Sequence, residues 1–291
     1  MSARDLPVEA LQPARNVPAT TAVDAHAHLE AGVVLGERCV VRSGAYLASG
    51  TVLGDGVYVG PNVAFSDAEN GVAAAVIETG AHIGANAVIA AGVTVARHAR
   101  VRPGSVVLRS VPTGAIVEGN PAAIVGYVNA APPALASRRR AVDDRETRIV
   151  ATCVKGVTVH NMPVIMDLRG DLTVGEFQRD VPFQPKRYFV VFGVPGREVR
   201  GEHAHYRCHQ FLVCVRGQFS VVADDGTQRV EVVLDAPNRG LYLPPMTWGI
   251  QYKHTPDAVM MVFASDYYDA SDYIRNHDEF LTALAAVKAT A

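Results

Sequence analysis

Large apolar residues recur at every sixth position along the first part of the chain. They are Val23, Leu29, Leu35, Val41, Leu47, Leu53, Val59 and Phe65, then, after one skipped unit, Ile77, Ile83, Ile89, Val95, Val101 and Val107. An α-helix repeats its apolar face every 3.6 residues and a strand every two, so a period of six fits neither alone. The period predicts a coil of triangular section, in which each hexad makes one short strand and one corner. The apolar residues would then point into a narrow prism.

The pattern changes near residue 147, where short runs rich in Val, Phe and Tyr alternate with turns of Gly, Pro and Asp. The runs cover residues 188–192, 210–215, 218–222, 230–234, 241–243 and 259–263. Their spacing predicts an antiparallel sandwich or small barrel, with a hairpin at Asp224-Asp225-Gly226 and a helical segment over 270–286. We therefore divide the chain into an extension (1–19), a β-helix (20–128), a linker (129–147) and a second all-β unit (148–291).

Aromatic residues are unevenly divided between these two halves. Four of them (Tyr46, Tyr58, Phe65 and Tyr127) precede residue 147, and 16 follow it. Rings fill volume in an ordinary core. Their scarcity in the first half leads us to expect a prism too narrow for rings and filled by aliphatic side chains.

Net charge, apolar runs and cysteine spacing limit the partners and the cellular compartment that we expect for the protein. A net charge of −2 gives no long-range basic field, so we do not expect nucleic acid as a partner. No apolar run reaches the length of about 18 residues that spans a membrane. The first residues carry no apolar stretch followed by a cleavage site, so we do not expect secretion. The four cysteines form no CxxC pair, which favours reduced thiols in a cytoplasmic protein.

A cluster of histidines stands out in the second half. Within Arg200-Gly201-Glu202-His203-Ala204-His205, the two imidazoles would point to one face of a strand, which in a small barrel can be the interior. Such a pair indicates either a metal site or acid–base catalysis. The spacing resembles the first cupin motif, but Gln210 stands where an acidic ligand is expected, and residues 240–249 hold no further His. Because Gln is a poorer metal ligand than a carboxylate, we expect no metal.

The hexad register resembles the left-handed parallel β-helix of the hexapeptide acyltransferases, and residues 117–127 are similar to the closing segment of its nucleotide-sugar N-acetyltransferases. The resemblance implies trimers with acetyl-CoA in the groove between subunits. It implies pantetheine contacts at Ala85, Ala91 and Gly92, and phosphate contacts at Arg100, Arg102 and Arg109. Asp67 or Glu69 would accept a proton or orient the sugar amine, and His82 or Asn86 would lie near the thioester. The family's acceptor-site loop, which leaves the coil after Phe65, is short and Ala-rich here.

Six segments of the second half, in order, resemble the dTDP-4-oxo-6-deoxyglucose 3,4-ketoisomerases. They are residues 167–172, 182–183, 186–189, 200–205, 234–242 and 264–275. The whole chain is similar to the WxcM-like bifunctional proteins, which fuse such a ketoisomerase to a sugar N-acetyltransferase and serve bacterial surface polysaccharide, including O-antigen, synthesis. One departure is Gly249, where the family often has a His directly after the Trp.

This second resemblance implies proton transfer from C3 to C4 of the sugar through an enediol, and imidazole has the near-neutral pKa that this step needs. We expect His205 to be the main base and His203 its partner. Further assignments are Arg187 and Arg200 to the enediolate or diphosphate, Tyr188 and Tyr242 to sugar oxygens, Arg169 and Lys186 to the nucleotide, and Gln210 and Trp248 to the substrate pocket. We expect His209 and the tail from Asp266 to Arg275 to be structural.

Several alternatives stay open at this point. The chain is either a two-site enzyme, a ketoisomerase whose β-helix is only a trimerisation scaffold, or a non-catalytic sugar-binding cupin. A sugar epimerase would use the same enolisation at a different carbon. Trimers of the β-helix and dimers of the cupin would combine as a trimer or a hexamer.

Overall fold

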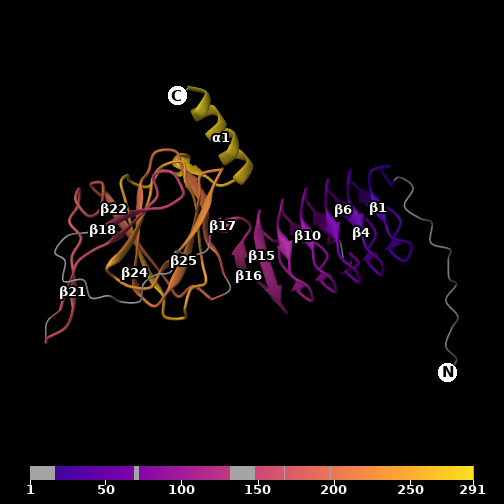
Figure 1. Cartoon of the computed structure of the whole chain (residues 1–291), viewed down its shortest axis with the longest axis horizontal. Helices are drawn as coiled ribbons and strands as arrows, with labels where there is room; N and C mark the ends of the chain where they lie inside the picture. The colour runs from indigo at the N-terminus through magenta and orange to yellow at the C-terminus, as the bar shows by residue number, and fades with distance from the viewer. Residues whose placement is uncertain (1–16, 69–71, 132–147, 167, 197, 291) are drawn as a thin grey trace. The chain divides into compact units, whose positions relative to one another are not determined.

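The computed structural model describes residues 17–68, 72–131, 148–166, 168–196 and 198–290. It divides into two compact units, Met1–Val128 and Asn129–Ala291, which we name the solenoid unit and the barrel unit (Figure 1). Most of the expected extension (1–16) and of the expected linker (132–147) lies outside the described residues. Within the described ranges, no helix has the length and apolar character needed to cross a membrane.

The solenoid unit is built from two-residue strands set six residues apart. They are β1 (Ala22–Val23), β2 (His28–Leu29), β3 (Val34–Leu35), β4 (Val40–Val41), β5 (Tyr46–Leu47), β6 (Val52–Leu53), β7 (Tyr58–Val59), β8 (Ala64–Phe65), β9 (Val76–Ile77), β10 (His82–Ile83), β11 (Val88–Ile89), β12 (Thr94–Val95), β13 (Arg100–Val101) and β14 (Val106–Val107). An antiparallel pair, β15 (Ala115–Gly119) and β16 (Ala122–Tyr127), follows them.

These strands stack into three parallel sheets, because each strand pairs with the third strand after it. The orders are β1-β4-β7-β10-β13-β15-β16, β2-β5-β8-β11-β14 and β3-β6-β9-β12. The second residue of every strand from Leu35 to Val107 is buried. The solenoid predicted from the hexad register is therefore confirmed, with its core on the predicted side chains.

The interrupted hexad adds one extra unit between β8 and β9. Because β9 pairs with β6, with Leu53 opposite Ile77, the chain rejoins the third sheet one hexad later than an unbroken register would allow. The insertion length equals the repeat length. The apolar phase therefore continues unchanged from Ile77 to Val107.

One aromatic ring lies inside the prism, contrary to the sequence-based expectation. Phe65 is only 1% exposed and belongs to the core at the coil where the extra residues leave. Its partner in the sheet, Ile89 of β11, is also fully buried. The prism therefore accepts a ring beside an aliphatic side chain.

The barrel unit contains the remaining strands and two short helical segments. They are β17 (Ala130–Ala131), β18 (Arg148–Ala151), β19 (Thr158–Asn161), β20 (Val164–Ile165), β21 (Leu172–Thr173), β22 (Arg187–Phe192), β23 (Arg200–His205), β24 (Gln210–Arg216), β25 (Phe219–Asp224), β26 (Arg229–Leu234), β27 (Arg239–Leu243), β28 (Trp248–Tyr252), β29 (Val259–Ala264), the 3₁₀ helix η1 (Ala270–Asp272), β30 (Tyr273–Ile274) and α1 (His277–Thr290). All six runs predicted as strands are strands, and the predicted hairpin joins β25 to β26. β28 was not predicted, since Gly249 and Gln251 interrupt its apolar pattern.

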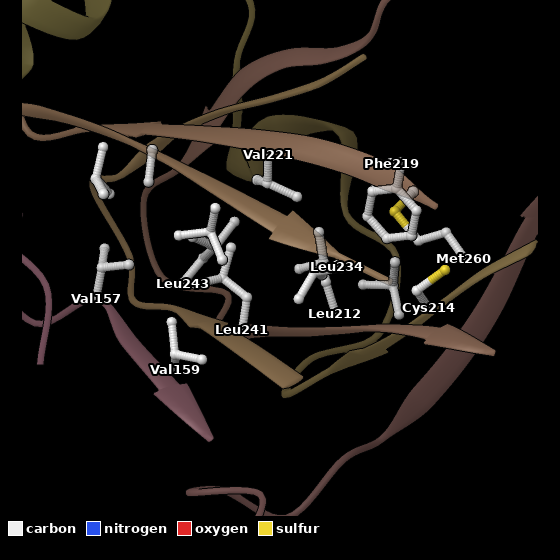
Figure 2. Close-up of a cluster of buried hydrophobic side chains, with 14 of the residues drawn as sticks. Val157, Val159, Leu212, Cys214, Phe219, Val221, Leu234, Leu241, Leu243 and Met260 are labelled. Carbon is white, nitrogen blue, oxygen red and sulfur yellow. The ribbon is translucent and has the colours of Figure 1, made fainter. Parts of the chain in front are cut away.

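Two six-stranded sheets form the barrel, with orders β17-β26-β25-β28-β23-β30 and β18-β19-β27-β24-β29-β22. Figure 2 shows Val221 and Leu234 of the first sheet pointing toward Leu212 and Leu241 of the second. Alternate residues of each strand supply this core, as the two-residue period of a strand requires. A second, smaller cluster around Phe211 and Val213 packs separately from it.

Candidate functional site

The two histidines of β23 point into one small cavity. β23 pairs with β28 on one side and β30 on the other, and a bulge interrupts the first pairing at Glu202. The ring centroids of His203 and His205 lie 5.0 Å apart at an interplanar angle of 83°. The cavity has a volume of about 10 Å³ and is also lined by Cys208, Gln210, Leu243, Pro244, Thr247, Gly249 and Gln251. A space of this size holds about one water molecule.

The hydrogen bonds of His205 define its tautomer. Its Nδ1 lies 3.0 Å from Oδ2 of Asp272, and its Nε2 lies 3.0 Å from Nε2 of Gln210. A carboxylate only accepts hydrogen bonds, so Nδ1 carries the proton and donates a hydrogen bond to Asp272. Nε2 then holds the lone pair and accepts from the Gln210 amide. His205 is 5% exposed, so these partners replace water for both nitrogens.

Asp272 reaches this position from the C-terminal part of the chain. It ends η1, immediately before β30, whose Ile274 pairs with Ala204. Its carboxylate also accepts the backbone N–H groups of Arg207, at 2.9 Å, and Cys208, at 3.2 Å. The sequence predicts a structural role for this tail and does not single out Asp272. The acidic residue of Asp-Tyr-Ile-Arg was a signal, although nothing local to it indicated a histidine partner.

Burial and neighbouring cations keep both imidazoles neutral. Burial, followed by His203, lowers the pKa of His205 to about 4, against an opposing contribution from Asp272. The Arg187 guanidinium lowers it further. Burial also lowers the pKa of His203, and Arg275 acts in the same direction. Near pH 7 both rings are therefore neutral.

Aromatic and guanidinium groups surround the histidine pair. The Tyr273 ring lies 5.0 Å from His203 and 4.3 Å from His205, centroid to centroid. The guanidinium of Arg275 lies 4.4 Å from the Tyr273 ring, and that of Arg187 lies 5.5 Å from the Tyr268 ring. The structure thus brings Arg187 to the predicted histidines and adds Tyr273 and Arg275, which the sequence analysis missed.

Three predicted site residues face elsewhere. Tyr188 is 67% exposed and follows Arg187 directly on β22, so the two side chains point to opposite faces. The Tyr242 hydroxyl lies 2.6 Å from Nδ1 of His209 and packs with the second cluster. Trp248 packs against His277 and Phe280 of α1. These three side chains therefore do not line the histidine cavity.

The cationic candidates occupy separate positions on the barrel unit. Lys186 forms an exposed ion pair with Asp266 at 3.0 Å. Arg169 is exposed between β20 and β21. Arg200, at the start of β23, lines a larger cavity of about 320 Å³ together with residues 190–195, Glu198 and Val199. Of the predicted site residues, Arg187, His203, His205 and Gln210 are the ones grouped around the imidazoles.

Metal-ligating atoms also meet at this site. Donor atoms of His205, Cys208 and Asp272 lie within 4.8 Å of one another, and nitrogen, sulfur and oxygen donors are those that zinc prefers. Each residue has a hydrogen-bond partner in the protein: His205 and Asp272 bond to each other, and the Cys208 thiol donates to the carbonyl of His209 at 3.4 Å. The side chains of His205, Cys208 and Asp272 therefore all have hydrogen-bond partners within the protein.

The acetyltransferase candidates lie on different sheets of the solenoid. Asp67 accepts a hydrogen bond from the Tyr46 hydroxyl at 3.0 Å, and the same hydroxyl reaches Glu30 at 3.4 Å. Burial and these carboxylates raise the pKa of Tyr46 to about 12. His82, on β10, stacks on Tyr58 with centroids 4.4 Å apart. Burial and Arg100 lower the pKa of His82.

The remaining solenoid candidates line corners and outer faces. Asn86 occupies a corner with a φ of 56° and accepts a hydrogen bond from Asn62 at 3.3 Å. Ala85 and Ala91 are partly buried, whereas Gly92, Arg100, Arg102 and Arg109 are exposed. Glu69 lies outside the described residues.

Comparison with known proteins finds relatives of both units. Residues 155–285 match the family model described as WxcM-like, C-terminal. The chain is 43% identical over 129 residues to the TDP-4-oxo-6-deoxy-alpha-D-glucose-3,4-oxoisomerase of Aneurinibacillus thermoaerophilus, covering 44% of this chain and 93% of that protein. The chain belongs to the WxcM-like family. The family resemblance predicted from six motifs is thus confirmed.

The solenoid of this WxcM-like protein has relatives of its own. Residues 74–109 match the model described as bacterial transferase hexapeptide (six repeats). A stretch of 53 residues is 51% identical to the dTDP-3-amino-3,6-dideoxy-alpha-D-galactopyranose 3-N-acetyltransferase of A. thermoaerophilus, spanning 18% of this chain and 28% of that enzyme. Among solved structures, QdtA, a sugar 3,4-ketoisomerase from Thermoanaerobacterium thermosaccharolyticum in complex with TDP, matches at 32% identity and a TM-score of 0.45. That match covers 46% of this chain and 97% of QdtA.

Proposed function

We propose that this WxcM-like protein is a bifunctional nucleotide-sugar enzyme whose barrel unit converts dTDP-4-oxo-6-deoxyglucose to the 3-oxo sugar. The observation that carries the proposal is the imidazole pair of a buried His205 and a half-buried His203, in which Nε2 of His205 is the unprotonated nitrogen. It occurs in a unit 43% identical to a 3,4-oxoisomerase over 93% of that enzyme. An unprotonated imidazole nitrogen inside a barrel suits proton abstraction next to a carbonyl once Gln210 releases it.

In the proposed mechanism, His205 carries one proton between adjacent carbons. Its Nε2 removes the C3 proton, and the electrons of that bond form a C3–C4 double bond as the C4 oxygen becomes anionic. The imidazolium then returns the proton to C4. The hydroxyl proton lost from the C3 oxygen passes to the C4 oxygen, which leaves a ketone at C3.

Neighbouring groups support this transfer. Arg187, whose positive charge acts on His205, stabilises the enediolate, and His203 is the partner imidazole. Gln210 must release Nε2 before the substrate can occupy that direction. Arg200, Lys186 and Arg169 are proposed contacts for the diphosphate and nucleotide, since guanidinium and ammonium groups bind phosphate oxygens.

The decisive experiment is product NMR after incubation with dTDP-4-oxo-6-deoxyglucose in deuterated water. We expect a 3-oxo product, deuterium at C4 to the extent that the imidazolium proton exchanges with solvent before it is returned, and loss of both in His205→Asn. His209→Asn is the matched control, because His209 pairs with Tyr242 outside the histidine cavity. A wild-type protein that binds the nucleotide sugar without forming product or exchanging deuterium would indicate a sugar-binding cupin, and exchange at another carbon would indicate an epimerase.

For the solenoid unit we propose N-acetylation of a dTDP-3-amino-3,6-dideoxyhexose with acetyl-CoA. The 51% identity to a 3-N-acetyltransferase supports it. Asp67, held by Tyr46, is the proposed group that orients the amine or takes its proton, with Glu69 an alternative and His82 or Asn86 near the thioester. Ala85, Ala91 and Gly92 would contact the pantetheine, and Arg100, Arg102 and Arg109 the phosphates.

Calorimetry with acetyl-CoA tests this second activity, followed by transfer to the amino sugar and a comparison with Asp67→Asn. We expect binding in both proteins and a transfer rate about 10²-fold lower in the variant, the lower end of general acid–base effects. Absence of acetyl-CoA binding would leave the solenoid as a scaffold.

We also propose a cytoplasmic homo-oligomer. Cys39, Cys153, Cys208 and Cys214 are all free thiols, as is usual in a reducing compartment. Trimers through the solenoid, or hexamers that add contacts between barrels, are the proposed assemblies. Sedimentation equilibrium on the full chain distinguishes them, and a monomer would contradict both.

A further inference from the structure

The buried carboxylate of Asp272 contacts His205, the proposed base. The Asp272 side chain is 6% exposed and bonds to the nitrogen of His205 that does not face Gln210. We infer that Asp272 is a positioning residue that holds His205 in the tautomer whose Nε2 is free to take the substrate proton. This inference rests on the proposed isomerase function of the barrel unit.

Backbone hydrogen bonds also hold Asp272 in place, in addition to the contact of its side chain with His205. The Asp272 N–H donates to the carbonyl of Asp269, and the Asp272 carbonyl accepts the N–H of Tyr206 at 3.0 Å. Asp269 also caps η1 by accepting from the N–H of Ser271 at 2.9 Å. These bonds attach the end of η1 to the chain that follows β23. The carboxylate therefore has little freedom of its own.

The remaining contacts orient the carboxylate oxygens. Oδ1 accepts from the N–H of Arg207, and Oδ2 accepts from the N–H of Cys208 and from Nδ1 of His205. Because backbone donors fix both oxygens, Oδ2 presents an acceptor to the imidazole. An acceptor at Nδ1 requires the proton on that nitrogen, which leaves the lone pair on Nε2.

The other groups that face His205 do not select its Nδ1–H tautomer. His203 precedes it on β23, and Arg187 acts on it from β22 as a cation. Tyr273 packs on the ring from β30. Gln210, on β24, is an amide whose two ends can donate or accept, so it adapts to either tautomer. Asp272 is the carboxylate recorded in contact with the imidazole among the described residues.

The same unit contains a second buried Asp–His pair that serves as a matched control. Asp224 is 2% exposed, and its Oδ2 lies 3.3 Å from Nε2 of His277 and 2.7 Å from Nε of Arg229. This pair connects α1 to the β25–β26 hairpin and lines neither cavity. Loss of its charge should affect folding stability alone.

The test combines nitrogen-15 NMR of the histidine rings with steady-state kinetics. In the wild-type full chain we expect His205 as the Nδ1–H tautomer. In Asp272→Asn, one amide N–H must face either a backbone donor or the imidazole. We therefore expect a mixed tautomer signal, with kcat lower by about 10²-fold, at the lower end of general acid–base effects, and KM within about threefold. Asp224→Asn should lower Tm and keep the wild-type kcat.

Two results would overturn the inference. One is a wild-type His205 found as the Nε2–H tautomer, which needs no variant to observe. The other is an Asp272→Asn protein with a lower Tm but wild-type kcat and tautomer, which would make Asp272 purely structural. Failure of the proposed function looks different, because the wild-type protein would then not isomerise the sugar while the NMR result still stands.

Discussion

The solenoid and barrel units place their histidines in opposite ways. In the solenoid, His28 and His82 point outward and stack on tyrosines one coil away, with centroids 5.5 and 4.4 Å apart. In the barrel, His203 and His205 point inward between segments far apart in sequence, and the His205–Asp272 contact joins residues 67 positions apart. The difference follows from the two cores. The solenoid prism is filled mainly by aliphatic side chains, whereas the barrel encloses polar groups that bond to one another.

The contrast teaches where chemistry can be located in each fold. Solenoid side chains of every second strand position are committed to the prism, so function there depends on outer faces and corners. The barrel interior holds both an apolar core and a hydrogen-bonded cluster.

Matched cavity mutations should affect the two units separately. Ile83 in the solenoid is 0% exposed and Leu212 in the barrel is 1% exposed, so Ile83→Ala and Leu212→Ala should each cost about 2–5 kcal/mol of unfolding free energy. We expect Ile83→Ala to leave the isomerase rate at 25 °C unchanged, measured beside calorimetric unfolding. A proportional loss of isomerase rate in Ile83→Ala would contradict the separation.

Acid should destabilise the barrel unit more than the solenoid. The pKa of His205 is about 4 when folded, against about 6.5 when unfolded, so the unfolded chain binds the extra proton between these values. Stability therefore falls as pH drops from about 6.5 to 4, by about 3 kcal/mol from this residue. Urea unfolding followed by tryptophan fluorescence reports on the barrel through Trp248. A flat profile across this window would show that His205 is not buried as described.

Trp248→Phe distinguishes packing from substrate contact. Since Trp248 packs on His277 and Phe280, we expect a loss of about 1 kcal/mol in stability and a KM within about twofold of wild type. Arg187→Ala, next to the imidazoles, is the comparison variant and should lower kcat. A large rise in KM for Trp248→Phe would restore the sequence-based assignment.

Removal of metal ions should have the smallest effect. We propose that the isomerase needs none, because Gln210 replaces a carboxylate ligand and the His205, Cys208 and Asp272 donors bond within the protein. Dialysis against a chelator should leave the isomerase rate within about twofold. Loss of activity that added zinc restores would assign a metal to these three residues.

Periodicity predicted the solenoid well and the barrel site partly. The hexads identified the buried positions, and only the ring of Phe65 was misjudged, since pattern alone does not measure local volume. In the barrel, the two-residue period predicted that His203 and His205 share a face. The same period, applied to the neighbours Arg187 and Tyr188, would have excluded one of them from that face.

Asp272 and Tyr273 could not be placed from sequence. Their role depends on β30 pairing with β23, and a two-residue strand of this kind carries no pattern that names its partner. The positions of Tyr242 and Trp248 away from the histidine cavity could not be predicted from sequence for a related reason. Tyr242 lies on β27, where it packs against the Phe211 cluster. Trp248 lies on β28, where it packs against Phe280 of α1.

The distance in sequence between His205 and Asp272 has a consequence for biosynthesis. During translation at 5–20 residues per second, the 67 residues that separate them take roughly 3–13 s to make. Until they emerge, β23 is an edge strand and its histidines have no carboxylate partner. The nascent barrel would thus lack the positioned base of the complete protein until its C-terminal segment docks, and the rise to the full isomerase rate would report the completion of folding.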